Sequence, residues 1–170
     1  LAIIIGITNY KNIPISVYAD KDAKLFSDFA YRSLGVSRDK IKLLINDTAN
    51  YIEIKKLLKR WLKNEIVKGK TDVYLFFAGH GLVSDNQKDL YLIPFDGEPS
   101  LLDDTSIKRS ELFSLISEND PSSITAFNAD CRRRYKGPFP LFSMSRVLRL
   151  AMTSDVAIMR RLFHVAWPSR

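Results

Sequence analysis

The sequence predicts an α/β protein with a mostly parallel central sheet that helices cover on both faces. This prediction depends on alternation: short apolar runs of strand length alternate with segments whose apolar residues follow helical spacing. The composition agrees, because 46% hydrophobic and 26% charged residues in a chain of 170 are ordinary for one globular domain. There is no run of about 18 apolar residues, so the sequence predicts no transmembrane helix.

The first half of the chain predicts two strands and two helices. The apolar run Leu1–Ile7 favours a strand that is buried on both faces, and a polar loop follows it. A helix is predicted from Asp20 to Leu34, and a second short strand at Ile41–Ile45. Turn residues then precede a long helix from about Tyr51 to Val67. Its core-facing side is formed by apolar residues at helical spacing: Ile54, Leu57, Leu58, Trp61 and Leu62.

The second half of the chain alternates in the same way. Val73–Ala78 predicts a third buried strand, and Leu90–Pro94 predicts a short strand in a hairpin-like excursion. A helix through Ser110 to Glu118 and a strand at Ile124–Phe127 follow. In sheets of this kind, ligands and chemistry gather just beyond the carboxyl ends of the strands. We therefore expect the functional residues at that edge of the sheet.

One of the two histidines and the single cysteine of the chain follow two of the predicted strands. His80 stands between two glycines after the third strand, and Cys131 comes soon after the last strand. A neighbouring imidazole can take the proton of a thiol and later protonate a leaving amine. The N–H groups of Gly81 and Cys131 are candidate donors to a developing oxyanion. The residues alone leave a plainer interpretation open, namely a turn after a strand and a cysteine that is a small buried apolar residue.

The rest of the composition excludes several kinds of site. One cysteine cannot form an intramolecular disulfide, which fits a reducing compartment, and a cytoplasmic protein is expected. Structural zinc sites with several cysteines are excluded for the same reason. Gly6 stands without a glycine-rich phosphate loop, so no nucleotide site is predicted. The other histidine, His164, is expected to be incidental.

Several motifs, in their order along the chain, resemble the caspase and metacaspase family of cysteine peptidases, particularly its bacterial members. LAIIIGITNY followed by YADKDAKLF is similar to the first strand and first helix of that family. VYLFFAGHG resembles the strand with the catalytic histidine, LYLIPFDG the segment after it, and ITAFNADC the strand that delivers the nucleophile. The interval of 51 residues between His80 and Cys131 agrees with the spacing of roughly 50 that caspases have. The resemblance covers residues 1 to about 131.

The resemblance implies a caspase-like three-layer αβα sandwich, and hydrolysis of peptide bonds by a Cys–His dyad without a cofactor. His80 would be the general base and Cys131 the nucleophile, with Gly81 and Cys131 as oxyanion donors. Asp22 matches an acid that in metacaspases helps to line a pocket for a basic residue before the scissile bond, and a solvated helix acid is the alternative. The loop Ser84–Asp89 could attract calcium by analogy with some metacaspases, but such a loop is far more often only a loop, so no metal is predicted.

The chain departs from the family pattern around Cys131. The acid expected two residues before the nucleophile is replaced by Ala129, and Arg132–Arg134 stand where small residues and glycine are typical. Residues 1–130 hold 17 Lys and Arg against 18 Asp and Glu, whereas residues 131–170 hold 9 against 1. We therefore predict a caspase-like catalytic domain at residues 1–131 and an atypical basic segment at residues 132–170. A reading-frame change or a gene remnant near codon 130 would explain this segment.

The sequence leaves three functions open. The first is a cysteine endopeptidase that acts on polypeptides and has partner domains on a longer parent chain. The second is a catalytically impaired caspase-like module for regulation or protein interaction. The third, a nucleic-acid or membrane binder, depends on the basic segment alone. That segment lacks the interleaved aromatic residues of nucleic-acid readers, so neither nucleic acid nor membrane is expected as a partner.

Overall fold

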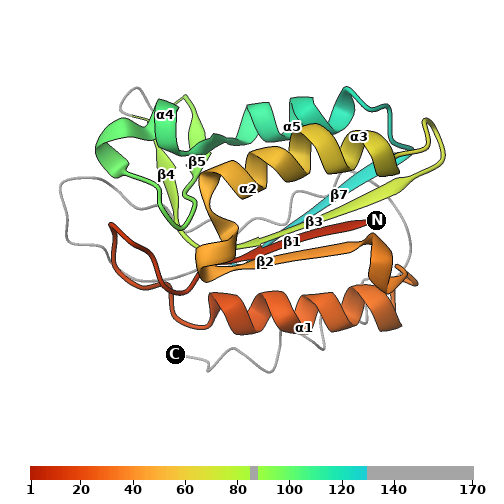
Figure 1. Ribbon diagram of the computed structural model, residues 1–170, viewed down its shortest axis with the longest axis horizontal. Coiled ribbons are helices and arrows are strands. Elements are labelled where there is room, and N and C mark those ends of the chain that lie inside the picture. Colours follow the sequence, from red (N-terminus) through yellow and green to blue (C-terminus); the bar gives the residue numbers. More distant parts are fainter. Residues whose placement is uncertain (85–87, 130–170) are drawn as a thin grey trace.

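The computed structural model describes residues 1–84 and 88–129, which form a parallel sheet between two helical layers (Figure 1). The sheet has the strand order β2-β1-β3-β7, and every neighbouring pair is parallel. Its strands are β1 (Ala2–Gly6), β2 (Ile41–Ile45), β3 (Asp72–Ala78) and β7 (Ser123–Ala129). The predicted α/β class with a mostly parallel central sheet is confirmed.

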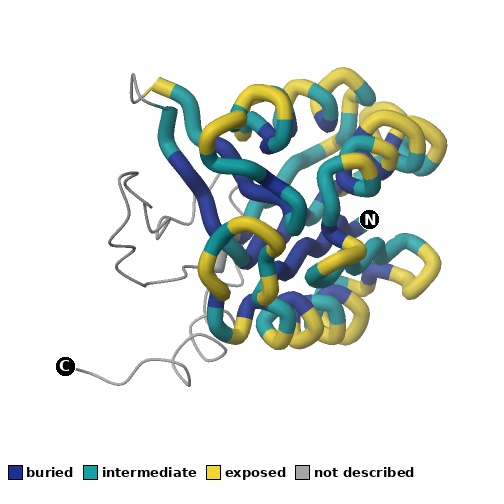
Figure 2. The backbone as a smooth tube through the Cα atoms, turned by 60° about the vertical axis from the view of Figure 1, so that its left-hand side comes forward, coloured by how far each residue is buried: buried dark blue, intermediate teal, exposed yellow. Residues whose placement is uncertain are grey.

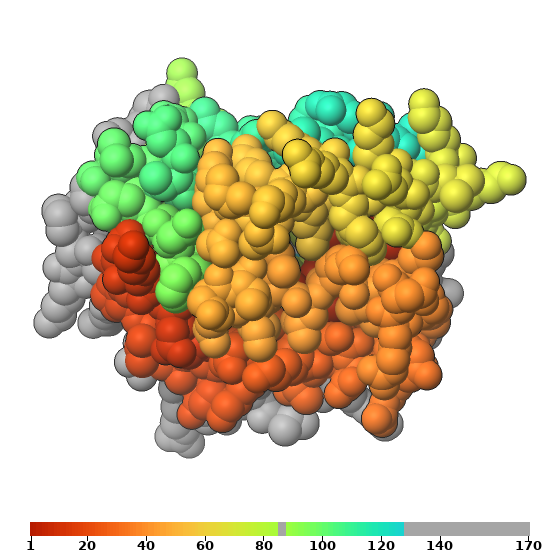
Figure 3. Space-filling model, in the orientation of Figure 1, coloured from red at the N-terminus to blue at the C-terminus, as the bar shows by residue number. Residues whose placement is uncertain are grey.

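Helices cover both faces of this sheet. Helix α1 (Ala19–Arg32) lies on one face. The other face carries α5 (Arg109–Ser117) and a long helix made of α2 (Tyr51–Lys56), the π-helical segment η3 (Leu57–Trp61) and α3 (Leu62–Glu65). On the surface drawn in Figure 3, this long helix lies between α5 and the layer of α1. The predicted helix from about Tyr51 to Val67 is thus confirmed, and it ends two residues earlier.

The two helical layers pack on alternating residues of the central strands. Ile3 and Ile5 of β1 and Leu75 of β3 belong to the apolar core under α2 and α5. Ile4 and Phe76, one residue along, belong to the core under α1. Since successive side chains of a strand point to opposite faces, a continuous apolar run serves both layers at once. Burial along the chain shows the same arrangement, with buried strands inside and exposed outer faces on the helices (Figure 2).

Gly6, the last residue of β1, allows α1 to approach the sheet. A Cβ atom at this position would overlap the Cβ of Ala23 and lie 2.5 Å from the carbonyl oxygen of Ala19. Small residues on both sides therefore set the distance between strand and helix. This close approach brings the first turn of α1 to the carboxyl edge of the sheet.

A second, antiparallel sheet forms beyond the end of β3, in the order β4-β5-β6. Its strands are β4 (Gly81–Val83), β5 (Leu90–Leu92) and β6 (Ile107–Lys108). The hairpin-like excursion predicted from the sequence is β4 and β5, but β6 was not anticipated. Its two residues pair with β5 just before α5 begins, after a short 3₁₀ turn η4 (Pro99–Leu101) and the single turn α4 (Leu102–Thr105).

Two short 3₁₀ segments, η1 (Arg38–Lys40) and η2 (Asn46–Ala49), flank the edge strand β2. None of the helices in the described part of the chain is both long and apolar enough to cross a membrane. The predicted boundary at residue 131 and the basic segment 132–170 lie outside the described residues, and the boundary stays a prediction.

Candidate functional site

The carboxyl ends of the parallel strands meet at one edge of the sheet, next to β4 and the loop that follows β1 (Figure 1). The strand register fixes which ends are neighbours: Ala78 of β3 pairs with Gly6 of β1 on one side and with Ala129 of β7 on the other. His80 comes two residues after Ala78 and is therefore at the middle of this edge, as the sequence predicts.

The imidazole of His80 is buried, with 5% of the residue exposed, and its Nε2 lies 3.0 Å from the carbonyl oxygen of Pro14. A carbonyl oxygen can only accept a hydrogen bond, so Nε2 carries the proton and donates it. In the neutral ring the lone pair is then on Nδ1. The contact with Pro14 thus selects the tautomer in which Nδ1 is the basic nitrogen.

The backbone of His80 is held on both sides. Its N–H donates to the hydroxyl of Tyr10 at 2.7 Å, and its carbonyl accepts from the N–H of Ile93 at 3.0 Å. The ring of Tyr10 also packs against the imidazole, with the ring centroids 5.1 Å apart and the planes inclined by 38°. Tyr10 and Pro14 both come from the loop after β1, so this loop and the end of β3 form one unit.

Burial determines the charge state of His80. Removal from water lowers the pKa of the imidazole below its ordinary value, and the backbone carbonyls of Pro14 and Ile15 oppose this because they favour the protonated ring. Desolvation is the larger effect, so the ring is neutral at pH 7. A neutral ring with its lone pair on Nδ1 is the form that a general base requires.

Gly81, the predicted oxyanion donor, begins β4 opposite Leu92 of β5. The bond from the N–H of Ile93 to the carbonyl of His80 makes this a non-hydrogen-bonded pair of the antiparallel ladder. The N–H of Gly81 therefore points away from β5. That direction leaves it able to donate to another group at the edge of the sheet.

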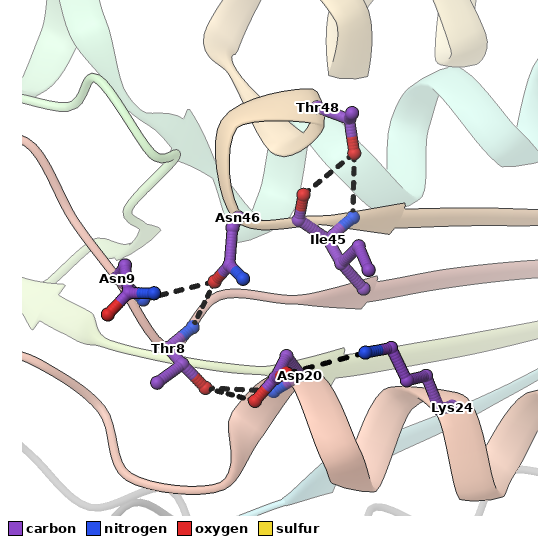
Figure 4. A network of polar contacts seen from close by, with 7 residues as sticks. All are labelled: Thr8, Asn9, Asp20, Lys24, Ile45, Asn46 and Thr48. Carbon is purple, nitrogen blue, oxygen red and sulfur yellow. Dashed lines mark hydrogen bonds and ion pairs between the residues drawn. The ribbon is translucent and has the colours of Figure 1, made fainter.

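The loop after β1 is itself anchored to η2, which directly follows β2, and to α1 (Figure 4). The side-chain oxygen of Asn46 accepts from the N–H groups of Thr8 at 2.9 Å and Asn9 at 3.0 Å. The hydroxyl of Thr8 donates to Asp20 at 2.7 Å. Asn46 is suited to this role because its backbone is left-handed, with φ of 48°, a conformation that Asn tolerates better than most residues. These bonds fix the loop immediately before Tyr10.

Comparison with known proteins shows to which family the chain belongs. A profile of the caspase domain, from the C14 family of peptidases, matches residues 1–139. The chain belongs to the caspase-domain family. A search of curated protein sequences found no match.

The fold of this caspase domain is similar to a crystal structure of the protein GSU0716 from Geobacter sulfurreducens. The TM-score is 0.56 at 17% sequence identity, over 75% of the present chain and 48% of the other. The chain thus spans about half the length of that protein. At this identity the likeness supports the fold alone.

Asp22, the predicted pocket acid, lies in the first turn of α1 and is half-buried. Burial raises the pKa of its carboxyl group above the ordinary value, and the nearby charge of Asp20 raises it further. Asp20 shows the opposite shift, because the hydroxyl of Thr8 donates to it and lowers its pKa. The family assignment does not by itself give Asp22 a role.

Cys131 and the N–H that it would contribute to an oxyanion site lie outside the described residues. Within residues 1–84 and 88–129, no group of three or more His, Cys, Asp or Glu side chains could hold a metal ion. Tyr10 and Pro14 were not singled out from the sequence. The loop after Ile7 was expected at the edge of the sheet, but no local pattern indicates which of its residues contact His80.

Proposed function

We propose that this caspase domain is a cysteine endopeptidase in which His80 is the general base and Cys131 the nucleophile. The family assignment supports a cysteine peptidase in general terms. The observation that carries the finer proposal is the register of β3 and β7, in which Ala78 pairs with Ala129. His80 and Cys131 each follow one of these paired residues by two positions.

In this proposal the chemistry begins with the lone pair of His80 Nδ1, which takes the proton of the Cys131 thiol. The thiolate attacks the carbonyl carbon of the substrate, and the negative oxygen accepts hydrogen bonds from the N–H groups of Gly81 and Cys131. The imidazolium then protonates the leaving amine, and water hydrolyses the thioester with His80 again as the base. Throughout, Nε2–H remains bonded to Pro14.

Asp22 is the proposed acid of a pocket for Arg or Lys before the scissile bond. Its half-buried carboxyl group has a raised pKa because it lacks solvation and lies near Asp20. A cation bound beside it would stabilise its ionised form, and the guanidinium of Arg matches a carboxylate best. In this proposal the ionised carboxyl group of Asp22 is stabilised by a bound substrate cation rather than by contacts within the folded chain.

The residues around Cys131 favour a second candidate, a caspase-like module that is catalytically impaired and acts in regulation or protein interaction. Ala129 replaces the acid that is typical two residues before the nucleophile, and three arginines, Arg132–Arg134, follow Cys131. Side chains of this size oppose the close approach of a substrate backbone.

Cleavage assays separate the two candidates. The full chain is incubated with fluorogenic peptides that end in Arg, Lys or Asp, with and without calcium, beside Cys131→Ala and His80→Gln variants. The peptidase proposal expects cleavage after Arg or Lys that both substitutions abolish, and labelling of Cys131 by a thiol-directed inhibitor. If no peptide is cleaved and Cys131 is not labelled, the impaired module is favoured.

A further inference from the structure

We infer that Tyr10 is a positioning residue for His80, which it holds through its hydroxyl group and its ring at the same time. The inference deepens the proposed function, because it concerns how the general base of that reaction is oriented. It depends on three contacts of Tyr10: the backbone of His80, the imidazole, and the space left by Gly79.

The first contact fixes the main chain. The N–H of His80 donates to the Tyr10 hydroxyl at 2.7 Å, although the two residues are 70 positions apart. A residue just after the end of a parallel strand has lost its ladder partners, so its N–H needs another acceptor. Tyr10 supplies this acceptor, whereas the bond from Ile93 satisfies the carbonyl on the other side.

The second contact fixes the ring. The phenol ring of Tyr10 packs against the imidazole with centroids 5.1 Å apart. Pro14, four residues after Tyr10, accepts the hydrogen bond from Nε2. The imidazole therefore contacts two groups of the same loop, a tyrosine ring and a carbonyl oxygen, which together restrict its rotation.

The third contact explains Gly79. A Cβ atom on this residue would overlap the Tyr10 hydroxyl and lie 3.2 Å from the ring of Phe77. Glycine before His80 thus meets two demands: its φ of 158° is one that other residues rarely adopt, and its missing side chain leaves room for the Tyr10 hydroxyl. Gly79 and Tyr10 form a matched pair, in which the missing side chain of one admits the hydroxyl of the other.

Tyr10 is held independently of His80. Asn46 binds the N–H groups of Thr8 and Asn9, and the N–H of Lys11 donates to the carbonyl of Phe95 at 2.9 Å. The residues on both sides of Tyr10 are therefore tied to other parts of the fold. Because Tyr10 is fixed in this way, it can hold the imidazole of His80 in one position. A small displacement of a general base from its reacting position lowers the reaction rate strongly.

Nuclear magnetic resonance of the full chain tests the inference without any need for activity. The variants are Tyr10→Phe, which removes the hydroxyl alone, and Tyr10→Leu, which also removes the aromatic ring. Tyr74→Phe is the matched control, because Tyr74 is a half-buried tyrosine of β3 that packs in the core under α1. The His164→Gln variant assigns the two histidine signals.

We expect Tyr10→Phe to accelerate hydrogen exchange of the His80 amide by about tenfold relative to Tyr74→Phe, because the N–H loses its acceptor. We expect Tyr10→Leu to raise the pKa of His80 toward its ordinary value and to weaken the preference for a proton on Nε2. If both Tyr10 variants match the control in amide exchange, tautomer and pKa, the inference is wrong.

An activity measurement separates this inference from the proposed function. Tyr10→Phe should lower kcat by about 10- to 100-fold with little change in KM, since the base is misplaced but the substrate contacts remain. If even the unmodified chain cleaves no peptide, the proposed function fails, while the resonance data still decide the role of Tyr10. An active Tyr10→Phe variant with unchanged kcat contradicts the inference.

The pair with Gly79 gives a second test. Gly79→Ala should lower the melting temperature, and Tyr10→Phe in the same chain should restore part of that loss by removing the overlapping oxygen. Such non-additivity is the signature of two residues in direct contact. A double variant that is no more stable than Gly79→Ala contradicts the matched pair.

Discussion

The surroundings of His80 and the first turn of α1 differ in how they hold their titratable groups. His80 is buried and fully held: Pro14 accepts from its ring, Tyr10 accepts from its N–H, and Ile93 donates to its carbonyl. In the first turn of α1, Asp20 is held by Thr8, whereas Asp22 is half-buried and has its pKa raised by burial and by the charge of Asp20.

This difference matters for the roles proposed for His80 and Asp22. Burial disfavours the charge of both His80 and Asp22, so the imidazole stays neutral and the ionised form of the Asp22 carboxyl group is poorly stabilised. For a general base a neutral ring is the useful state. For an acid with the role proposed for Asp22, a bound substrate cation would stabilise the ionised form. The five predictions below test the two regions against each other.

The largest effect is expected at His80. His80→Gln should lower kcat/KM for a cleaved peptide by about 10²- to 10⁴-fold, because the proposed general base is lost while the hydrogen-bonding shape of the side chain is partly kept. Asp22→Asn should keep most of kcat. Initial rates of both variants on the same peptide measure the difference. An equal loss of kcat in the two variants would contradict the proposal that His80 is the base and Asp22 a residue of the binding pocket.

The packing of α1 on β1 comes next. Gly6→Ala should destabilise the fold by about 1–3 kcal/mol, since the new Cβ would overlap Ala23. Gly35→Ala is a less crowded comparison, because no atom lies within 4 Å of a Cβ there, although its left-handed φ of 69° adds strain. Urea denaturation of the two variants measures each loss, and a smaller loss for Gly6→Ala would contradict the role of close approach.

The stability should depend on pH through His80. Its pKa in the folded chain is lowered, so the unfolded chain binds more protons as the pH falls below the ordinary value of about 6.5. The free energy of unfolding should therefore fall as the pH drops from about 7 toward the lowered pKa of the folded state. His80→Gln should have a smaller slope over this range in urea denaturation. Equal slopes would mean that His80 is not buried as a neutral ring.

The two acids in the first turn of α1 should respond in opposite directions. Asp20→Asn should destabilise the fold by about 1 kcal/mol, because it weakens a charged hydrogen bond to Thr8. Asp22→Asn should leave stability unchanged or raise it at pH 7, since a neutral amide replaces a carboxylate with a raised pKa. Thermal unfolding measures both. The same Asp22→Asn variant should raise KM for Arg and Lys peptides, and an unchanged KM would remove Asp22 from the proposed pocket.

The smallest effect is expected at Tyr18, which precedes α1 with a left-handed backbone, φ of 71°. Tyr18→Gly should stabilise the fold by about 0.5–1 kcal/mol, because glycine adopts this conformation without strain. The ring is exposed, and the loss of its contact with Lys21, 5.3 Å from the centroid, is a small opposing effect. A lower melting temperature for this variant would show that the contact outweighs the strain.

The elements that the sequence predicted best are those whose pattern is local. The limits of β2 were correct at both ends, and those of β1, β3, β7 and α1 within about two residues, because apolar runs and helical spacing mark them directly. The short strand β6 was missed. A segment of two residues is too short to show the alternation of apolar and polar residues that marks a strand. Ile107–Lys108 form a strand only because they pair with β5. The π-helical segment within the long helix was missed for a similar reason, since its spacing differs too little from that of an α-helix.

The sequence by itself determined the fold class and the position of His80 at the carboxyl edge of the sheet. Both follow from the order of apolar segments and from the glycines around the histidine. Only the tertiary structure decided which nitrogen of His80 is basic, why Gly79 has no side chain, and why Asp20 and Asp22 differ. The hydrogen-bond partners that settle these points are 12 to 70 residues away along the chain. The spacing of residues along a short segment predicts neither such contacts nor the burial of a side chain.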